Sequence, residues 1–128
     1  GSCVQKLPHV AEITSVSSSG NYLLTASSDN AHRVWDVRTF RFVSRLTGHE
    51  NTSKKFIRAV FGRNETYVAS GSQDGFVYIW DNPAEQSTSS ISANRRLGSG
   101  EGGVVYDVAC CDDSLFSCGD NGVVHEWR

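Results

Sequence analysis

The chain has 128 residues, of which 38% are hydrophobic and 20% are charged, and its formal net charge at pH 7 is -2. This balance provides no electrostatic reason to expect binding to nucleic acid or to a membrane, and the length allows one domain at most. Because no apolar run approaches the roughly 18 residues of a membrane span and no N-terminal segment resembles a signal peptide, we expect an intracellular protein, cytoplasmic or nuclear.

The first third of the chain predicts one isolated strand followed by a group of four. Val4 to Leu7 forms a short candidate outer strand, and Ile13 to Ser17 alternates apolar and polar residues, as a half-buried strand does. After the turn residues 18–21, the same reading gives strands at Tyr22 to Ala26, His32 to Val37 and Phe40 to Leu46.

The rest of the chain repeats this order twice. The expected strands are Phe56 to Phe61, Tyr67 to Gly71, Phe76 to Trp80, Ile91 to Leu97, Val104 to Cys110, Ser114 to Ser117 and Val123 to Trp127. The polar segments 50–55 and 82–90 are expected to be solvated loops. No helical periodicity of useful length is found, so the chain is predicted to be all-β.

Three tryptophans mark an internal repeat. Trp35, Trp80 and Trp127 are spaced 45 and 47 residues apart. Each follows a turn residue by six positions and a hydroxyl residue by ten: Asp29 and Thr25, Asp74 and Ser70, Asn121 and Ser117. Three copies at one offset are a strong signal of a repeat architecture.

The central repeat adds a second signature, because Gly48-His49 precedes its strands and Trp80-Asp81 closes them. On these residues the chain resembles the WD-repeat (WD40) family. The resemblance implies a β-propeller made of four-stranded blades, and a buried hydrogen-bond chain in each blade that joins tryptophan, hydroxyl, histidine and turn carboxylate. Its members would be His49, Ser70, Asp74 and Trp80 in repeat two, His9, Thr25, Asp29 and Trp35 in repeat one, and Ser117, Asn121 and Trp127 in repeat three, where 98–103 contains no histidine.

Finer resemblances exist to two groups of WD-repeat proteins. Residues that look like the autophagy-16-like propellers are Tyr22-Leu23-Leu24, Arg33, Trp35 and Leu46-Thr47-Gly48-His49. Residues that resemble the WD-repeat subunit of histone-methyltransferase complexes are Gly48-His49, Asn51, the segment 56–61, Ser70-Gly71-Ser72, Asp74 and Val77-Tyr78-Ile79-Trp80.

The repeats divide the chain into three blades' worth of material. Residues 1–2 look like a tag remnant, and residues 3–128 form the repeat domain, with repeats at about 9–46, 48–97 and 98–128. Residues 3–7 are expected to complete the last blade. Since propellers usually close with about 4–8 blades, we expect either a part of a larger propeller or a ring completed by identical chains.

The leading functional hypothesis is a non-catalytic scaffold that binds other proteins or peptides, with an architectural oligomerisation module as the alternative. A hydrolase triad of Ser70, His49 and Asp74 is less well supported, because the pattern recurs in repeat one and no nucleophile-elbow sequence surrounds Ser70. No catalytic residue, metal site or cofactor is therefore expected.

A candidate partner-binding surface follows from the turns. Ser28, Gln73 and Asp120 each precede the turn residue of a repeat, which places them at one end of the blades, near a basic group at the start of an inner strand. The complete set is Ser28, Gln73, Asp120, Lys54, Lys55 and Arg58. An acidic or phosphorylated peptide would complement it; the alternative is an ordinary solvated loop.

Overall fold

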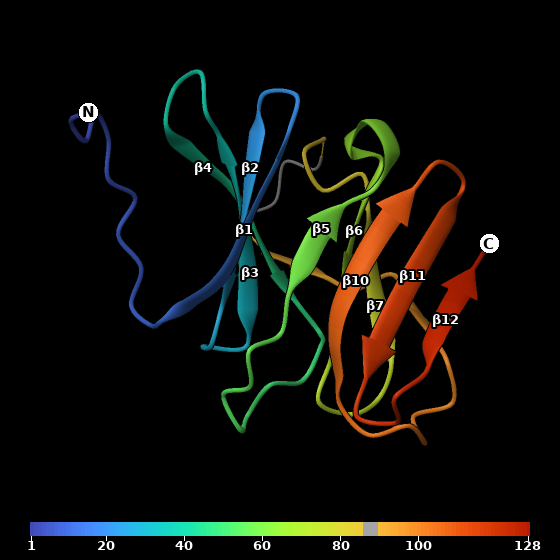
Figure 1. Cartoon of the computed structure of the whole chain (residues 1–128). Helices are drawn as coiled ribbons and strands as arrows, with labels where there is room; N and C mark the ends of the chain where they lie inside the picture. The colour runs from blue at the N-terminus through green and yellow to red at the C-terminus, as the bar shows by residue number, and fades with distance from the viewer. Residues whose placement is uncertain (86–89) are drawn as a thin grey trace.

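The structure is a computed structural model that describes residues 1–85 and 90–128. Three β-sheets stand side by side, and we refer to them as blades one, two and three (Figure 1). Blade one contains β1 (Ile13–Ser19), β2 (Tyr22–Ser27), β3 (Ala31–Asp36), β4 (Arg41–Thr47) and β8 (Ser90–Ser92). Blade two contains β5 (Ala59–Phe61), β6 (Tyr67–Ser70), β7 (Val77–Asp81) and β9 (Arg95–Leu97), with a 3-10 turn, η1 (Arg63–Glu65), after β5. Blade three contains β10 (Val105–Cys111), β11 (Ser114–Gly119) and β12 (Val124–Trp127).

The predicted all-β class is confirmed, but the blades are not uniformly four-stranded: they contain five, four and three strands. Most strands lie within two residues of their predicted bounds. The strand predicted from Phe56 is an exception, since β5 begins only at Ala59. Of the polar loop predicted at 82–90, residues 86–89 lie outside the described residues.

Val4 to Leu7, expected as an outer strand, is not a strand in the structure. The segment extends away from blade one, on the side opposite blade three, and Val4 is 88% exposed (Figure 1). An extended segment becomes a strand only when its backbone pairs with another edge, and no described strand borders this one.

The predicted strand Ile91 to Leu97 is split between two sheets. Its second part, β9, pairs antiparallel with β7 as the outer strand of blade two. Its first part, β8, pairs parallel with β4, so that Ile91 lies beside Leu46 on the outer edge of blade one. Ile91 is 5% exposed while its serine neighbours are exposed, so burial of this one side chain accounts for the crossing. We call residues 90–94 the strap.

The strap is fastened to both blades by backbone hydrogen bonds. The amide of Ala93 donates to Thr47 O (2.9 Å) in blade one, and the amide of Asn94 donates to Ile79 O (2.8 Å) in blade two. Below it, Pro83 is fully buried, and its carbonyl accepts from the Ser44 hydroxyl (3.4 Å). The segment between β7 and β9 therefore connects the two blades along their outer edges.

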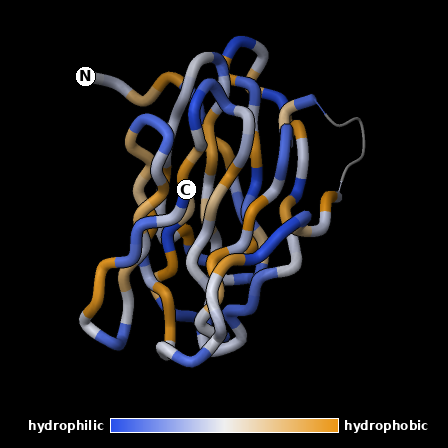
Figure 2. The backbone as a smooth tube through the Cα atoms, turned by 90° about the vertical axis from the view of Figure 1, so that its right-hand side faces the viewer, coloured by the Kyte–Doolittle hydropathy of each residue, from blue (hydrophilic) through white to orange (hydrophobic). Residues whose placement is uncertain are grey.

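Apolar side chains fill the two spaces between neighbouring blades. Between blades one and two the core is built around Leu24, Val34, Leu46, Val68 and Trp80, each at most 1% exposed. A second cluster lies between blades two and three and contains Ala69, Val77, Ile79, Val108 and Leu115. Figure 2 shows the apolar stretches along the strands and hydrophilic residues at most turns. Within the described residues, no helix has the length and apolar character needed to cross a bilayer.

Candidate interaction surface

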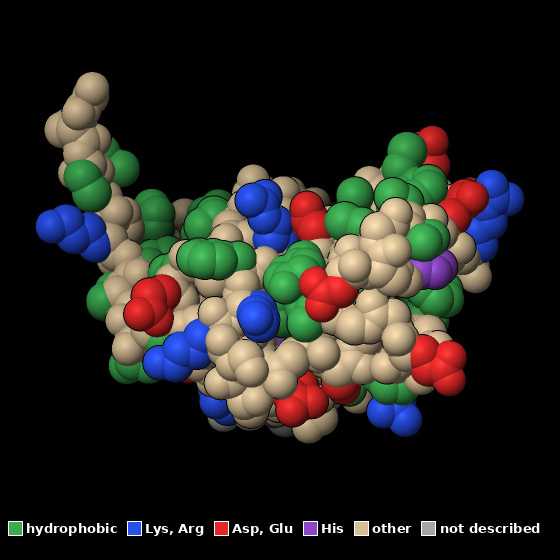
Figure 3. Space-filling model, turned by 60° about the horizontal axis from the view of Figure 1, so that its bottom comes forward, with side chains coloured by type: hydrophobic (Ala, Val, Ile, Leu, Met, Phe, Trp, Pro, Cys, Tyr) green, Lys and Arg blue, Asp and Glu red, His purple; other side chains and the backbone are tan. Residues whose placement is uncertain are grey.

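The turns that connect the second and third strands of each blade meet at one end of the molecule, the lower end in Figure 1. The links that lead into β5 and β10 also lie there. We call this surface the turn end; it comprises residues 28–30, 49–58, 72–76, 98–104 and 119–123. All six residues of the predicted partner-binding set belong to it. Figure 3 brings this end forward and shows Lys and Arg side chains interspersed with apolar ones and flanked by Asp and Glu.

The segment 50–55 forms a fixed turn rather than a loose link. Asn51 is 2% exposed, and its side-chain amide donates to Lys55 O (2.9 Å) while its oxygen accepts from the Lys55 amide (2.7 Å). The Asn51 backbone amide donates to the side-chain oxygen of Asn30 in the β2–β3 turn. Lys54 has a φ of 52°, in the left-handed region. These contacts hold the exposed Lys54 and Lys55 side chains at defined places.

Gln73 and Ser28 are structural parts of this surface. The Gln73 side-chain oxygen accepts from the Ser53 amide (2.8 Å), and its backbone amide donates to Glu50 O (2.8 Å), so Gln73 holds the 50–55 turn against blade two. Ser28 is only 6% exposed and its hydroxyl donates to Glu12 Oε2 (2.7 Å). The prediction places Ser28 at the correct end, but its side chain already has a partner.

Arg58 and Asp120 lie nearer blade three. The Arg58 amide donates to Tyr106 O (2.8 Å), and its carbonyl accepts from the Gly71 amide (3.3 Å), which leaves the guanidinium exposed. Asp120 Oδ2 accepts from the Val104 amide (3.0 Å). Burial raises the pKa of the Tyr106 phenol, and the negative charge of the nearby Asp120 carboxylate acts in the same direction.

Phe56 is a surface residue that the sequence reading missed. Predicted as the first residue of a strand, it lies instead before β5, between Lys55 and the buried Ile57, and its side chain is 76% exposed. An exposed aromatic ring within two residues of the exposed Lys54, Lys55 and Arg58 combines an apolar anchor with positive charge. One feature of the sequence indicated this exposure: Phe56 directly follows the polar segment 50–55, where it has no neighbouring strand residue to pack against.

Acidic groups partly offset the positive charge at this end. The Ser28 hydrogen bond lowers the pKa of the Glu12 carboxyl, and the charge of Lys54 acts in the same direction. Glu12 therefore remains ionised and shares the surface with Lys54.

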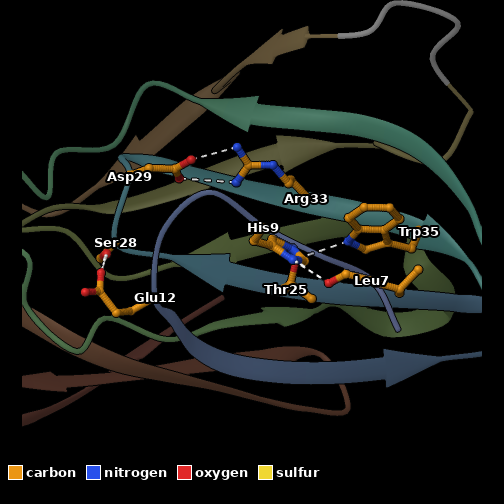
Figure 4. A network of polar contacts seen from close by, with 8 residues as sticks. All are labelled: Leu7, His9, Glu12, Thr25, Ser28, Asp29, Arg33 and Trp35. Carbon is orange, nitrogen blue, oxygen red and sulfur yellow. Dashed lines mark hydrogen bonds and ion pairs between the residues drawn. The ribbon is translucent and has the colours of Figure 1, made fainter. Parts of the chain in front are cut away.

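The hydrogen-bond chain of blade one is continuous from tryptophan to histidine (Figure 4). Trp35 Nε1 donates to Thr25 Oγ1 (3.1 Å), and His9 Nε2 lies 2.8 Å from the same oxygen. His9 Nδ1 lies 2.9 Å from Leu7 O, a carbonyl that only accepts. The neutral ring therefore carries its hydrogen on Nδ1, and Thr25 donates to Nε2.

The turn carboxylate of blade one does not join this chain, in contrast to the prediction. Asp29 instead accepts two hydrogen bonds from the Arg33 guanidinium (3.2 and 2.7 Å). Burial raises the pKa of Asp29, but the paired guanidinium outweighs burial and leaves the pKa below its ordinary value. An arginine four residues away offers a charged, two-pronged donor, which a neutral imidazole does not.

Blade two departs further from the predicted chain. Trp80 Nε1 donates to Thr47 O (2.8 Å) rather than to Ser70, and Ser70 donates to Gly71 O (2.8 Å). The turn carboxylate, Asp74, accepts from the Tyr78 hydroxyl and from the Phe76 amide.

The imidazole that reaches Ser70 comes from blade one. His32 Nε2 lies 2.6 Å from Ser70 Oγ, and since the Ser70 hydrogen points to Gly71 O, His32 Nε2 is the donor. His49, the predicted partner of Ser70, stacks on His32 with ring centroids 4.1 Å apart and meets Trp80 edge-on. His49 precedes its inner strand by ten residues, whereas His9 precedes β1 by four, so the longer link places His49 differently.

Both histidines of this stacked pair are held neutral. Burial lowers the pKa of His49 to about 4, against a smaller opposing effect of Asp74 and Asp29. Burial also lowers the pKa of His32 well below its ordinary value, and His49 and Arg33 act in the same direction. Within the described residues, neither ring nitrogen of His49 has a hydrogen-bond partner. Among the described residues, His49 therefore makes no hydrogen bond to Ser70, and the nucleophile–base contact of the Ser70, His49 and Asp74 triad is not formed.

Blade three retains the first step of the chain. Trp127 Nε1 donates to Ser117 Oγ (2.9 Å), as Trp35 does to Thr25. Asn121 does not contribute to it, since its side-chain oxygen accepts from the Val123 amide (3.1 Å).

Residues 1–36 and 40–81 match the family described as WD domain, G-beta repeat. The chain belongs to the WD40 repeat family. Its WD40 relatives include Autophagy-related protein 16 of Arabidopsis thaliana, which is 39% identical over 127 residues covering 93% of this chain and 23% of that protein. Protein Atg16l2 of Mus musculus is 36% identical over 83 residues, covering 62% and 13% of the respective chains.

The WD40 relatives support the resemblance to autophagy-16-like proteins and give no support to the histone-methyltransferase resemblance. The chain spans 23% and 13% of the lengths of these two curated relatives. The crystal structure of the computationally designed Ika8 protein superposes with a TM-score of 0.69 at 24% identity, covering 93% of this chain and 34% of that one. At this identity the WD40 fold alone is shared.

Proposed function

We propose that this WD40 chain is a non-catalytic scaffold that binds an acidic or phosphorylated peptide of a partner protein at the turn end. The observation that carries the proposal is Phe56, a 76% exposed ring within two residues of the exposed Lys54, Lys55 and Arg58. Aromatic and arginine side chains dominate the energetics of protein interfaces, and cationic side chains form strong charge-assisted hydrogen bonds to carboxylate and phosphate.

The rigidity of the turn supports the same proposal. Asn51 and Gln73 fix the backbone of residues 51–55, so that little backbone conformational entropy would be lost when a peptide binds the two lysines. Ser70 is hydrogen-bonded to His32, and His49 stacks on His32 instead of contacting Ser70. Asp74 accepts from the Tyr78 hydroxyl. These contacts favour a structural role for the polar residues.

Replacing both lysines, Lys54→Glu with Lys55→Glu, should weaken binding of a short fluorescein-labelled peptide of glutamate and phosphoserine by about tenfold or more, since two charge-assisted contacts are lost. Fluorescence anisotropy measures this, and Phe56→Ala should weaken binding with little change in its salt dependence. The matched control, Arg41→Glu with Arg63→Glu, changes the net charge equally at the opposite end. Equal binding by all variants would mean that the turn is only a solvated loop.

A second candidate function, an architectural module that assembles with its own kind, rests on a different observation. The outer faces of the outermost blades carry exposed apolar side chains, including Val16 (63% exposed) in blade one and Val124 (68%) in blade three. The outer edge of β12 has no neighbouring strand among the described residues. Residues 3–7 of a second copy would add a strand there.

Light scattering at micromolar concentration should therefore give the mass of a dimer, in which each N-terminal segment completes the last blade of its partner. Deletion of residues 3–7 should return the mass to that of a monomer. A monodisperse monomer that unfolds cooperatively would refute the self-assembly candidate and leave peptide binding untouched. A dimer that persists after the deletion would exclude strand exchange.

A further inference from the structure

A cavity lies beside the link 98–103, which has no counterpart of His9; the cavity lining does include one histidine, His125 of β12, whose ring stacks on Trp127 with centroids 5.7 Å apart. The cavity measures about 360 Å³ and lies between blades two and three at the turn end. Its lining includes Ser117 and Trp127 of blade three, Val77 of blade two, and Glu101 and Gly102 of the link into β10. Cavities of this size are in the range that accepts small ligands.

The cavity corresponds to the position of His9 in blade one. Thr25 and Ser117 both stand ten residues before a tryptophan and accept its indole hydrogen. In blade one the Thr25 hydroxyl donates a hydrogen bond to His9 Nε2. Glu101 stands 26 residues before Trp127, the same spacing as His9 before Trp35, and it lines the cavity.

Ser117 is therefore left with one hydrogen to donate. Ser117 is 4% exposed, and its hydroxyl oxygen already accepts a hydrogen bond from Trp127 Nε1. A serine hydroxyl supplies one donor as well as its acceptor lone pairs, and no hydrogen bond of the described residues uses this donor. A buried donor without an acceptor favours any ligand that brings one.

We propose that this cavity binds a small neutral nitrogen heterocycle, with imidazole as the simplest member. The unprotonated ring nitrogen accepts from the Ser117 hydroxyl and so extends the chain that begins at Trp127. The ring packs against Val77 and Trp127, and the Glu101 carboxylate is the charged acceptor on the lining for a ring N–H, beside the neutral side chains of Asn121 and His125. Two sources share this chemistry: a free heterocycle, and the histidine side chain of a partner peptide.

Titration with imidazole at pH 8, where imidazole is largely neutral, tests the proposal through the three indole N–H signals in ¹⁵N NMR spectra. The Trp127 signal should move saturably with a dissociation constant of about 1 mM, as expected for so small a ligand, while the Trp35 and Trp80 signals stay in place. Pyrrole, a ring of similar shape without an accepting nitrogen, should produce no saturable shift. Absence of a saturable Trp127 shift with imidazole, or equal shifts of all three signals, would overturn the proposal.

Two variants separate this site from adventitious binding. Ser117→Ala should weaken imidazole binding at least tenfold, whereas Ser117→Thr, which keeps the hydroxyl, should retain it. Glu101→His places a histidine 26 residues before Trp127, the spacing of His9 in blade one. The introduced imidazole ring should fill the cavity and abolish the saturable Trp127 shift with free imidazole. It should also raise the urea midpoint of unfolding. Undiminished binding in Ser117→Ala or in Glu101→His would refute the assignment.

The source of the ring is distinguished by comparing free imidazole with a short glycine-flanked histidine peptide. If the peptide binds more tightly than free imidazole, a partner's histidine side chain is the ligand. If free imidazole shifts the Trp127 signal and the peptide does not, the ligand is a free heterocycle. Because the readout is at Trp127, it is independent of peptide binding near Phe56.

Discussion

Lowering the pH from 7 to 4 should reduce the free energy of unfolding by about 3 kcal/mol through His49 alone. Burial lowers the pKa of this residue from 6.5 to about 4 in the folded chain, and each unit of pKa difference corresponds to about 1.4 kcal/mol. Between these values the unfolded chain binds a proton at His49 that the folded chain does not. The stabilising contribution is thus fully present above pH 6.5 and is lost as the pH falls toward 4.

His32 adds to this loss in the same direction, since its pKa is also lowered. Urea unfolding at pH 7, 6 and 5 measures the effect in a range where most carboxylates remain ionised. His49→Phe keeps an aromatic ring between His32 and Trp80 and should flatten the pH dependence, whereas His125→Gln, at an exposed site, should leave it unchanged. If His49→Phe retained the wild-type pH dependence, the buried pair would not be its source.

Trp80→Ala should lower the free energy of unfolding by about 3–5 kcal/mol, the range for a large aromatic removed from a core. The Trp80 side chain is fully buried between blades one and two and touches both stacked histidines. Its indole also donates to Thr47 O in β4, the strand that pairs with β8. The substitution therefore creates a cavity and removes one of the two hydrogen bonds that Thr47 O accepts, the other coming from the Ala93 amide.

Trp80→Phe separates these two contributions in part, because it keeps a six-membered aromatic ring while it removes the indole donor and leaves only a smaller cavity; a loss of about 1–3 kcal/mol is expected. Trp127→Ala provides the comparison, since that ring is only half-buried and should cost less. Urea midpoints at pH 7 measure all three variants. A Trp80→Ala midpoint equal to that of Trp127→Ala would contradict the central place given to Trp80.

Alternation of apolar and polar residues predicts most of this fold, because each inner and middle strand buries one face against a neighbouring blade. β1, β2, β3 and β10 all begin within one residue of the expected position. The strap was not predictable in this way. β8 is three residues long and pairs parallel with a strand 45 residues earlier, so that its position depends on tertiary packing of Ile91 and not on local pattern.

The hydrogen-bond chains likewise divide into contacts that the sequence predicts and contacts that it does not. Trp35 with Thr25 and Trp127 with Ser117 lie ten residues apart on adjacent strands, so spacing alone brings them together. The bond of His32 to Ser70 crosses between blades and spans 38 residues, and no spacing within a repeat indicates it. At the turn end the sequence located the basic residues but not Phe56, because the start of β5 was placed three residues too early.

The strap also bears on how the chain comes apart. Repeat proteins can unfold one repeat at a time when each unit contacts only its neighbours through side chains. Here residues 90–94 lie in the second repeat by sequence but are hydrogen-bonded to the first blade as well as the second. Opening either blade breaks the hydrogen bonds of this shared segment, so we expect the amides of blades one and two to exchange with solvent as one cooperative unit.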